Sequence, residues 1–543
     1  MPLGTYDRIP GMDSGNNLTP EVRNALLSTS EFVNAFAQRV LKGDFGIHIK
    51  DYIPTPDGVT DNTTNFLAAA NAAKSARVPL VLDPTKTYVL NGLVLPTDMI
   101  LITNDAPLVK KVNNNTYAIR TSNRTRIDSI NLTITGGASS DAGVYVNGND
   151  TVIDRIKVVS VNGDQIGPNA LLVGSISGQV YNVRINSIEL NGFQSPMRTY
   201  NLYNSTLRNA RISNFITGVY VVNTVDTEFT KFEVTGTSPS ATGANGQNGM
   251  LMEAQSTDFA CSNVTFNQWL VDGAPEHSFR IGGALSVIDI TFRDCLSRRP
   301  GNAAGNVATG GGAFKVLGAS GHMHRGIHFI NCTAEDSNTN ANGTNNFTQF
   351  SLGWVDGCSL ISPVVRKRSN TYSAKAALFL NAVNDIRIVS PNFRDTQTFA
   401  VFLGKDASNT TGEGVTNVKF IGGILHSALT HAIEFTTDTV TTKNVAFDGT
   451  SIIGNTTVVR GVRFNAAGSG GAYTNVFLDV SYELNATLPG SGEPSLVTPA
   501  AGVMIRYRGP VYGYTITADN GSTMMDTTAG AFKIRKAGAW VAL

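Results

Sequence analysis

Short apolar runs recur along the chain and are separated by polar turns. Each run reads small, apolar, variable, apolar, and successive runs begin about 23 to 36 residues apart. The segments with this pattern are 218–221, 249–252, 278–281, 313–316, 349–352, 377–380, 400–403, 432–435 and 461–464. Because side chains on a β-strand alternate between its two faces, the two apolar residues point inward and the variable one points outward. The pattern predicts a repeated array of short strands.

A second strand follows most of these runs. Its segments are 263–266, 288–292, 326–329, 385–388, 417–420 and 444–447. Each coil of a solenoid contacts only its neighbours, so like residues stack on like. We therefore expect Phe266, Phe292 and Phe329 to form one stack, and Cys295 to lie on Cys332. The antiparallel pairs and short hairpins of an immunoglobulin-type array do not match this pattern. The predicted fold class is all-β, a right-handed parallel β-helix.

An Ala-rich segment precedes the coils. Residues 66–73 read Phe-Leu-Ala-Ala-Ala-Asn-Ala-Ala and follow Asp61 and Asn62, either of which can cap a helix. We predict a helix over about 61–75. Its apolar face would close the end of the solenoid, which otherwise exposes core residues and unpaired strand edges.

The residues around this helix resemble the opening of pectate-lyase-like β-helices. Residues 57–61 read Asp-Gly-Val-Thr-Asp, as in that family, and Asn62 stands where the family has a second Asp. Segments 78–83 and 87–90 are similar to the strands with which the family's β-helix begins. The resemblance covers roughly residues 46–485 and implies a β-helix domain there. It is specific for the fold and contains no motif for a reaction.

The two ends of the chain differ from the coils. Thr19 and Pro20 begin a predicted helix with a seam spaced 4, 3, 4, 3, 4, formed by Val22, Leu26, Thr29, Val33, Phe36 and Val40. Residues 1–45 are interpreted as an attachment tail and a helix that packs on its own β-helix, forms a short trimeric coiled coil or docks elsewhere. Residues 486–543 are expected to form a linker and a small β tip around a turn at 519–521, which holds subunits together.

Composition and charge narrow the class of protein. A chain of 543 residues is too long for one ordinary compact core, which fits a repeat array. Lys and Arg number 42 and Asp and Glu 41, so the net charge of +1 gives no broad basic field for nucleic acid. The start, Met-Pro-Leu-Gly, is unlike a signal peptide, and no run of about 18 apolar residues predicts membrane insertion.

Cysteines and histidines give no sign of a metal site. The four cysteines lie on strand-like segments without a CxxC pair, and we expect them to be buried free thiols: Cys261, Cys295, Cys332 and Cys358. The histidines that stand near strands lack metal-ligand spacing and are interpreted as surface or turn residues: His277, His322, His324, His328 and His431. We expect no metal and no cofactor.

A neutral β-helix with an extra N-terminal helix and a small C-terminal β region resembles viral tailspikes. The resemblance implies a homotrimer of the virion tail, made in the host cytoplasm. Its N-terminus would dock on the virion or another tail protein, and its β-helix would bind a bacterial capsule or O-antigen. Pectinases share the fold, but polygalacturonases carry Asn-Thr-Asp, Asp-Asp and Gly-His-Gly in that order. This chain lacks the first two, and residues 321–323 match the third only in part.

Three adjacent coils carry long turns that are expected to line one wall of a groove. The turns are 235–248, 300–311 and 337–346, all rich in Gly, Asn and Thr. Glycoside hydrolysis needs two carboxylates in such a groove. The acids expected to supply this pair are Glu253, Asp272, Glu276, Glu335 and Asp336. The expected substrate-binding residues are Arg280, Lys315, Arg298, Arg299 and Trp269, whose exposed indole would stack on a sugar.

A structural role is the alternative for several of these residues. In register, Arg298 should lie over Glu335, and Arg299 over Asp336, which would make two structural ion pairs. Glu276 can equally be a solvated turn residue.

Two cations have a regular place on the coils. Arg280 and Lys315 take the outward position on successive coils, above Leu251 and below Ser351, and this placement also suits binding of acidic sugars.

Three functions remain open at the level of sequence. The first is a hydrolase that cuts a bacterial surface polysaccharide. The second is a lyase on the same fold, for which Tyr220 could act with Arg280 and Lys315 on one outer ladder. The third is a spike that binds its receptor without cutting it.

Overall fold

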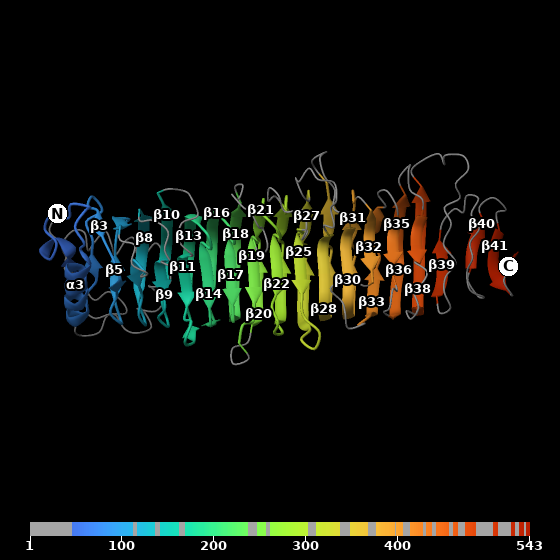
Figure 1. The fold of residues 1–543 in the computed structure, drawn as a ribbon, viewed down its shortest axis with the longest axis horizontal. Helices are drawn as coiled ribbons and strands as arrows, with labels where there is room; N and C mark the ends of the chain where they lie inside the picture. Colours follow the sequence, from blue (N-terminus) through green and yellow to red (C-terminus); the bar gives the residue numbers. More distant parts are fainter. Residues whose placement is uncertain are drawn as a thin grey trace, which may run out of the picture.

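The protein is a rod of stacked coils. The computed structural model describes residues 46–111, 117–135, 142–161, 169–236, 247–256, 261–301, 311–336, 348–367, 376–396, 398–404, 413–426, 431–436, 441–454, 460–464, 473–484, 503–508, 523–526, 531–536 and 539–542. The coils follow one another along the rod from the N-terminal helix to the C-terminal strands (Figure 1). Among the described strands, 39 belong to a single sheet whose neighbours are parallel. The predicted parallel β-helix is confirmed.

The strands form three faces, which we call A, B and C. Face A contains β4 (Leu93–Val94), β7 (Ile119–Arg120), β9 (Ala142–Val146), β11 (Asn169–Gly174), β14 (Met197–Tyr200), β17 (Val219–Val222), β19 (Met250–Glu253), β22 (Phe279–Gly282), β25 (Phe314–Leu317), β32 (Phe399–Leu403), β35 (His431–Phe435) and β37 (Arg460–Phe464). Two longer strands begin on face A and continue onto face B, β28 (Thr348–Ile361) and β30 (Ala376–Val389).

Face B contains β1 (Ile47–His48), β2 (Leu80–Val81), β5 (Ile100–Ile102), β20 (Ser262–Asn267), β23 (Ile288–Arg293), β26 (His324–Ile330), β33 (Val415–Ile421) and β39 (Val503–Arg508). The strands that run from face B onto face C are β8 (Arg126–Ile134), β10 (Val152–Ser160), β13 (Arg184–Phe193), β16 (Thr206–Phe215), β18 (Val225–Thr235), β36 (Thr442–Gly454) and β38 (Tyr473–Leu484). Two short strands precede face B, β12 (Val180–Tyr181) and β15 (Leu202–Tyr203).

Face C contains β3 (Tyr88–Val89), β6 (Pro107–Lys110), β21 (Leu270–Asp272), β24 (Leu296–Arg298), β27 (Thr333–Glu335), β29 (Val364–Arg366), β31 (Asn392–Phe393) and β34 (Ile424–His426). A separate antiparallel sheet contains β40 (Thr523–Asp526), β41 (Ala531–Lys536) and β42 (Ala539–Ala542). The parallel pairing of β39 with β38 extends the ladder beyond residue 485. Residues 1–45 and 485–502, with the predicted N-terminal helix and linker, lie outside the described residues.

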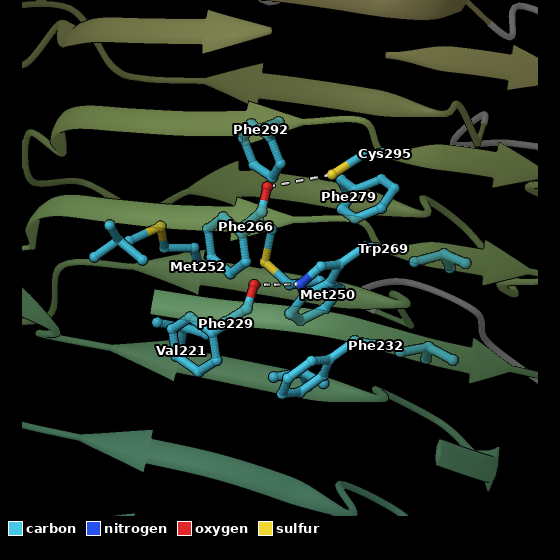
Figure 2. Close-up of a cluster of buried hydrophobic side chains, with 14 of the residues drawn as sticks. Val221, Phe229, Phe232, Met250, Met252, Phe266, Trp269, Phe279, Phe292 and Cys295 are labelled. Atoms are coloured by element: carbon cyan, nitrogen blue, oxygen red, sulfur yellow. Dashed lines mark hydrogen bonds between the residues drawn. The ribbon is translucent and has the colours of Figure 1, made fainter. Parts of the chain in front are cut away.

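The core is built from stacked aromatic rings (Figure 2). Phe266 and Phe292 stack with their ring centres 5.0 Å apart, and Phe292 and Phe329 with theirs 5.1 Å apart, as the register predicted. A second stack joins Phe279 to Phe314 at 4.8 Å. Each buried Phe contributes about 1.5 to 3 kcal/mol through removal of its surface from water.

Trp269 belongs to this core, and the prediction of an exposed sugar platform was wrong. Its side chain is 1% exposed, it stacks on Phe232 at 4.3 Å, and its indole nitrogen donates a hydrogen bond of 3.0 Å to the carbonyl of Phe229. The physical reason is its register: Leu270 lies opposite Leu296, which places Trp269 in the same inward ladder as Cys295.

The four cysteines are buried free thiols, as predicted. The Cys295 thiol donates to the carbonyl of Phe266 at 3.4 Å, and the Cys332 thiol donates to that of Phe292 at 3.5 Å. Burial, reinforced by the neighbouring Cys295, raises the pKa of the Cys332 thiol well above its ordinary value. The predicted Cys295–Cys332 contact is present.

The N-terminal end of the stack carries a helix, α3 (Thr63–Ala76), preceded by the 3₁₀ turn η1 (Ile49–Asp51). The Asp61 carboxylate accepts a hydrogen bond of 2.8 Å from the amide of Thr63, whereas the Asn62 side chain accepts one of 3.0 Å from Val89 and so ties the helix to the coils. Phe66 is buried against Tyr88, with ring centres 6.4 Å apart. In the described part of the chain, no helix is long and apolar enough to cross a membrane.

Asparagines stack at the turns that lead into face B. Asn417, Asn444 and Asn475 have φ of +54°, +56° and +52°, a left-handed conformation that Asn tolerates better than most residues. Each donates its side-chain amide to the preceding Asn of the ladder, Asn417 to Asn384 at 2.8 Å and Asn475 to Asn444 at 3.1 Å. The ladder fixes the bend between faces A and B.

Candidate active site

The outward position of face A forms a continuous ladder of side chains. From one coil to the next, the residues in register are Arg198, Tyr220, Leu251, Arg280, Lys315 and Ser351. Their strand neighbours Met252 and Ile281 point into the core and are 0% and 1% exposed. The predicted placement of Arg280 and Lys315 on successive coils is confirmed.

Glu253 ends β19 on this outward side and is half-buried. The hydroxyl of Tyr220, one coil earlier, donates a hydrogen bond of 2.6 Å to its carboxylate. The side-chain amide of Gln255 donates to the same oxygen at 3.3 Å. These donors hold the Glu253 carboxylate in one orientation.

Two glycines on the next coil leave room for this carboxylate. Gly282 lies opposite Glu253, and a Cβ there would meet Arg280 Nε at 3.5 Å and Glu253 Oε1 at 3.9 Å. Gly283 has φ of +99°, and a Cβ on it would meet the Cβ of Glu253 at 3.5 Å. The guanidinium of Arg280 and the carboxylate of Glu253 therefore approach the same open space over Gly282.

Glu276 lies on the other side of Arg280. It precedes β22, where its amide donates a hydrogen bond of 2.8 Å to the carbonyl of Gln247. One of its carboxylate oxygens is 3.6 Å from Arg280 Nη1, and the other is 3.3 Å from His277 Nε2. Its side chain is buried, so the alternative of a solvated turn residue was wrong. Arg280 thus stands between two glutamates from adjacent coils.

His277 is buried as well, which corrects its interpretation as a surface or turn residue. It is 3% exposed, and burial lowers the pKa of its imidazole to about 4, while Glu276 partly opposes this shift. The ring is therefore neutral near neutral pH and can both donate and accept a hydrogen bond.

Several buried polar atoms near Glu276 have no hydrogen-bond partner among the described residues. They are both side-chain polar atoms of Asn248, Nδ1 of His277 and Nε of Arg280. Buried polar groups in folded proteins are almost always paired with protein, water or ligand. These atoms form a buried polar cluster beside Glu276.

Glu335 is held in a different way. Its side chain is 1% exposed, one oxygen accepts from Arg298 Nε at 2.9 Å, and the other accepts from Arg366 Nε at 2.8 Å. The predicted contact of Arg298 with Glu335 is confirmed. Both oxygens face arginines, which is the arrangement of a structural ion pair.

Asp272 ends β21 on face C, and Asp336 directly follows β27 on the same face. The prediction that Arg299 pairs with Asp336 was wrong, because the Arg299 side chain binds Asp272 at 2.8 Å. Arg299 has φ of +46°, and this left-handed conformation directly after β24 turns its side chain back toward the preceding coil. Only the backbone of Arg299 follows the expected register, its amide donating to the carbonyl of Glu335 at 3.1 Å.

The remaining histidines do not form a common site. His324 is buried, contrary to its interpretation as a surface residue, and its Nδ1 accepts a hydrogen bond of 3.1 Å from the amide of Val287. His328 Nδ1 is 2.8 Å from the hydroxyl of Ser359. Within the described ranges, no group of three or more His, Cys, Asp or Glu residues is placed to hold a metal ion.

Sequence reasoning missed part of the candidate site. Asn248 was passed over because an Asn beside Gly resembles any turn, and Arg198 lay on an unremarked outward position. The adjacency of Glu276 and His277 was the signal that could have indicated a polar cluster. Most of the three long turns, 237–246, 302–310 and 337–347, lies outside the described residues, so the expected groove wall stays a prediction.

Comparison with known proteins identifies the fold. No family model matches the sequence, and no curated protein matches it. The N-terminal fragment of gene product 12 of bacteriophage Phi29 is similar, with a TM-score of 0.53 and 14% identity over 94% of this chain and 99% of that one. The tailspike protein of E. coli bacteriophage HK620, solved with a pentasaccharide, has a TM-score of 0.50 and 11% identity over 92% of this chain and 84% of that one. At these identities the similarity shows a shared β-helix fold.

Proposed function

We propose that this protein is a phage tailspike that recognises a bacterial surface polysaccharide, capsule or O-antigen, and depolymerises it by glycosidic hydrolysis. The observation that carries the proposal is the placement of Arg280 between Glu253, on the outward side of face A, and the buried Glu276 of the next coil. The fold that the chain shares with a tailspike solved with a pentasaccharide supports the same function.

Hydrolysis uses one carboxyl group as the acid that protonates the leaving oxygen, and the other as nucleophile or as base toward water. Glu253 and Glu276 supply this pair in the proposal. Tyr220 orients Glu253, and Arg280 balances charge beside Glu276. Glu335 is the least suited of the five candidate acids, because arginines occupy both its oxygens.

A lyase on the same fold is the second candidate. It would abstract a proton beside a uronic carboxylate, with Tyr220 as base and a cation such as Arg198 nearby. Burial, together with the bond to Glu253, raises the pKa of Tyr220 above its ordinary value, which makes the phenolate harder to form. Tyr220 is therefore a poor base, and hydrolysis is favoured.

Assembly belongs to the same proposal. A tailspike would be a homotrimer, would attach to the virion tail or another tail protein through residues 1–45, and would act at the bacterial surface. The heptad spacing in those residues supports this arrangement.

The test is to incubate the protein with polysaccharides from candidate hosts. Hydrolysis gives new reducing ends without an ultraviolet-absorbing double bond, elimination gives absorbing products, and a purely binding spike leaves the polymer intact. We expect Glu253→Gln and Glu276→Gln each to lower kcat at least about 100-fold, the usual weight of an acid or base. Glu228→Gln is the matched control, because Glu228 is a half-buried glutamate on face B. Full activity in both site variants would refute this assignment.

A further inference from the structure

Tyrosines gather on the N-terminal half of the rod. Six lie between residues 117 and 220, namely Tyr117, Tyr145, Tyr181, Tyr200, Tyr203 and Tyr220. From residue 221 to 471 the sequence has a single tyrosine, Tyr372. Five of the six are half-buried at the surface, and Tyr145 is 9% exposed. These tyrosines extend along the rod from the coil beside Glu253 toward α3.

Two of these rings lie against one arginine on face A. Arg198 sits between Tyr200 and Tyr220, 4.3 Å and 4.4 Å from their ring centres, and its buried Nε has no hydrogen-bond partner among the described residues. Arg198 and Tyr220 occupy the outward ladder that also contains Arg280. Tyr220 in turn binds Glu253, so this part of the surface adjoins the candidate active site.

The same ladder continues toward the N-terminus. Arg120, Tyr145 and Arg198 lie in register, with Leu172 between Tyr145 and Arg198. The ring of Tyr117 covers that of Tyr145, with centres 4.5 Å apart, and Arg120 lies 5.1 Å from the Tyr145 ring. Tyr117 also lies near enough to Arg198 to interact with its charge.

A second pair of rings lies where β12 and β15 precede face B. Tyr181 and Tyr203 are 5.1 Å apart with their planes tilted by 37°. Gln179 joins their hydroxyls, donating to Tyr203 at 3.3 Å and accepting from Tyr181. Rings held in this way lose little freedom when a ligand stacks on them.

We propose that a tyrosine surface is an extended glycan-binding site that holds the polymer on the N-terminal side of Glu253. The tyrosine surface consists of Tyr117, Tyr145, Tyr181, Tyr200 and Tyr203, and it adjoins Tyr220, which orients Glu253. Tyrosine offers an apolar ring for the face of a sugar and a hydroxyl for its edge, and the arginines donate to hydroxyl or carboxylate groups. Coils are about 4.8 Å apart, so the ladder from Arg120 to Glu253 spans several sugar units along the rod axis. The inference rests on the proposed function, because the surface is placed relative to Glu253.

The test measures binding of the polymer by the Glu253→Gln, Glu276→Gln double variant, so that the ligand stays intact. We expect Tyr117→Ala and Tyr203→Ala each to weaken binding of long polymer about tenfold, and Tyr117→Phe to retain it. Phe402→Ala is the matched control, because Phe402 is a half-buried ring on the same outward ladder of face A, beyond the glutamates. Thermal unfolding midpoints show whether each variant is folded.

The outcomes separate the two proposals. If the wild-type protein cuts the polymer but the tyrosine variants bind it normally, the tyrosine surface is refuted and the active site stands. The same conclusion follows if Phe402→Ala weakens binding as much as the tyrosine variants do. If the wild-type protein binds and does not cut, and the tyrosine variants lose binding, the surface stands and hydrolysis is refuted. If it neither binds nor cuts any tested polymer, both are overturned.

Discussion

At the scale of single residues, burial decides which candidate groups can meet a ligand. Trp269 and His277 show why the sequence alone misplaces them. The register of one coil against the next, and not residue type, turned the indole of Trp269 inward. His277 reads as a turn residue, yet the protein buries it beside Glu276. Neither outcome follows from the local pattern, because both depend on what the neighbouring coil presents.

The buried imidazole of His324 makes the stability of the protein depend on pH in acid. Burial lowers its pKa to about 4, against about 6.5 in the unfolded chain. Between these values the unfolded chain binds a proton that the folded protein does not, so the free energy of unfolding falls as pH is lowered from 6.5 to 4. The full effect is roughly 3 kcal/mol, and it is absent above pH 6.5.

We expect His324→Asn to weaken this pH dependence, because the amide oxygen can accept the Val287 hydrogen bond without titrating. Unfolding midpoints in denaturant at pH 7 and pH 4.5 measure it. The exposed His322→Asn should retain the wild-type slope. An unchanged slope in His324→Asn would contradict the assignment, whereas a residual slope fits the buried His277.

At the scale of the strand, charges alternate along the edge of face C. Asp272, Arg298, Glu335 and Arg366 follow one another in register on successive coils. The carboxylate of Glu335 is 1% exposed, whereas the side chains of Arg298 and Arg366 are 36% and 44% exposed. The cost of breaking this ladder therefore depends on which partner is removed.

We expect Glu335→Gln to destabilise the protein by about 1 to 3 kcal/mol, since the arginines left behind can reach water. The double variant Arg298→Ala, Arg366→Ala should cost about 3 to 5 kcal/mol, because it removes both arginines from a buried carboxylate. Denaturant unfolding compares the two, and hydrolysis per folded molecule should stay at the wild-type level in Glu335→Gln. The reverse order of stabilities, or loss of hydrolysis in that variant, would show that Glu335 has another role.

The direction of each side chain on its strand, inward or outward, was the most predictable part of the fold. The alternation of apolar and variable positions placed Phe266 on Phe292 and Arg280 beside Lys315. The bends between strands were not predictable in the same way. Left-handed residues such as Asn417 and Arg299 redirect the chain, and their side-chain partners depend on a conformation that the sequence pattern does not specify.

At the scale of the whole molecule, the rod has the parallel β-helix fold that the resemblance to tailspikes implied. The candidate site was predictable only as a set of acids on neighbouring coils. Choosing among them required the arginines around Glu335 and the hydrogen bond from Tyr220 to Glu253, both of which join residues more than 30 positions apart.

The proposed homotrimer is tested by mass. Size-exclusion chromatography with light scattering should give three times the 57.6 kDa of one chain, because the heptad seam in residues 1–45 and the C-terminal β tip are both expected to join subunits. Deletion of residues 1–45 is the matched comparison, and it should lower the stability of the trimer against dilution. A single-chain mass for the full protein would contradict trimer formation.

The alternation of inward and outward positions on face A also bears on how such a protein can change over time. Val221 and Ile281 hold neighbouring coils together, while Tyr220 and Arg280, one residue away, face outward. Substitution of an outward residue leaves the inward packing intact, so its cost in stability is usually small. New ligand preferences can therefore accumulate one coil at a time, through single mutations, while the rod that displays them persists.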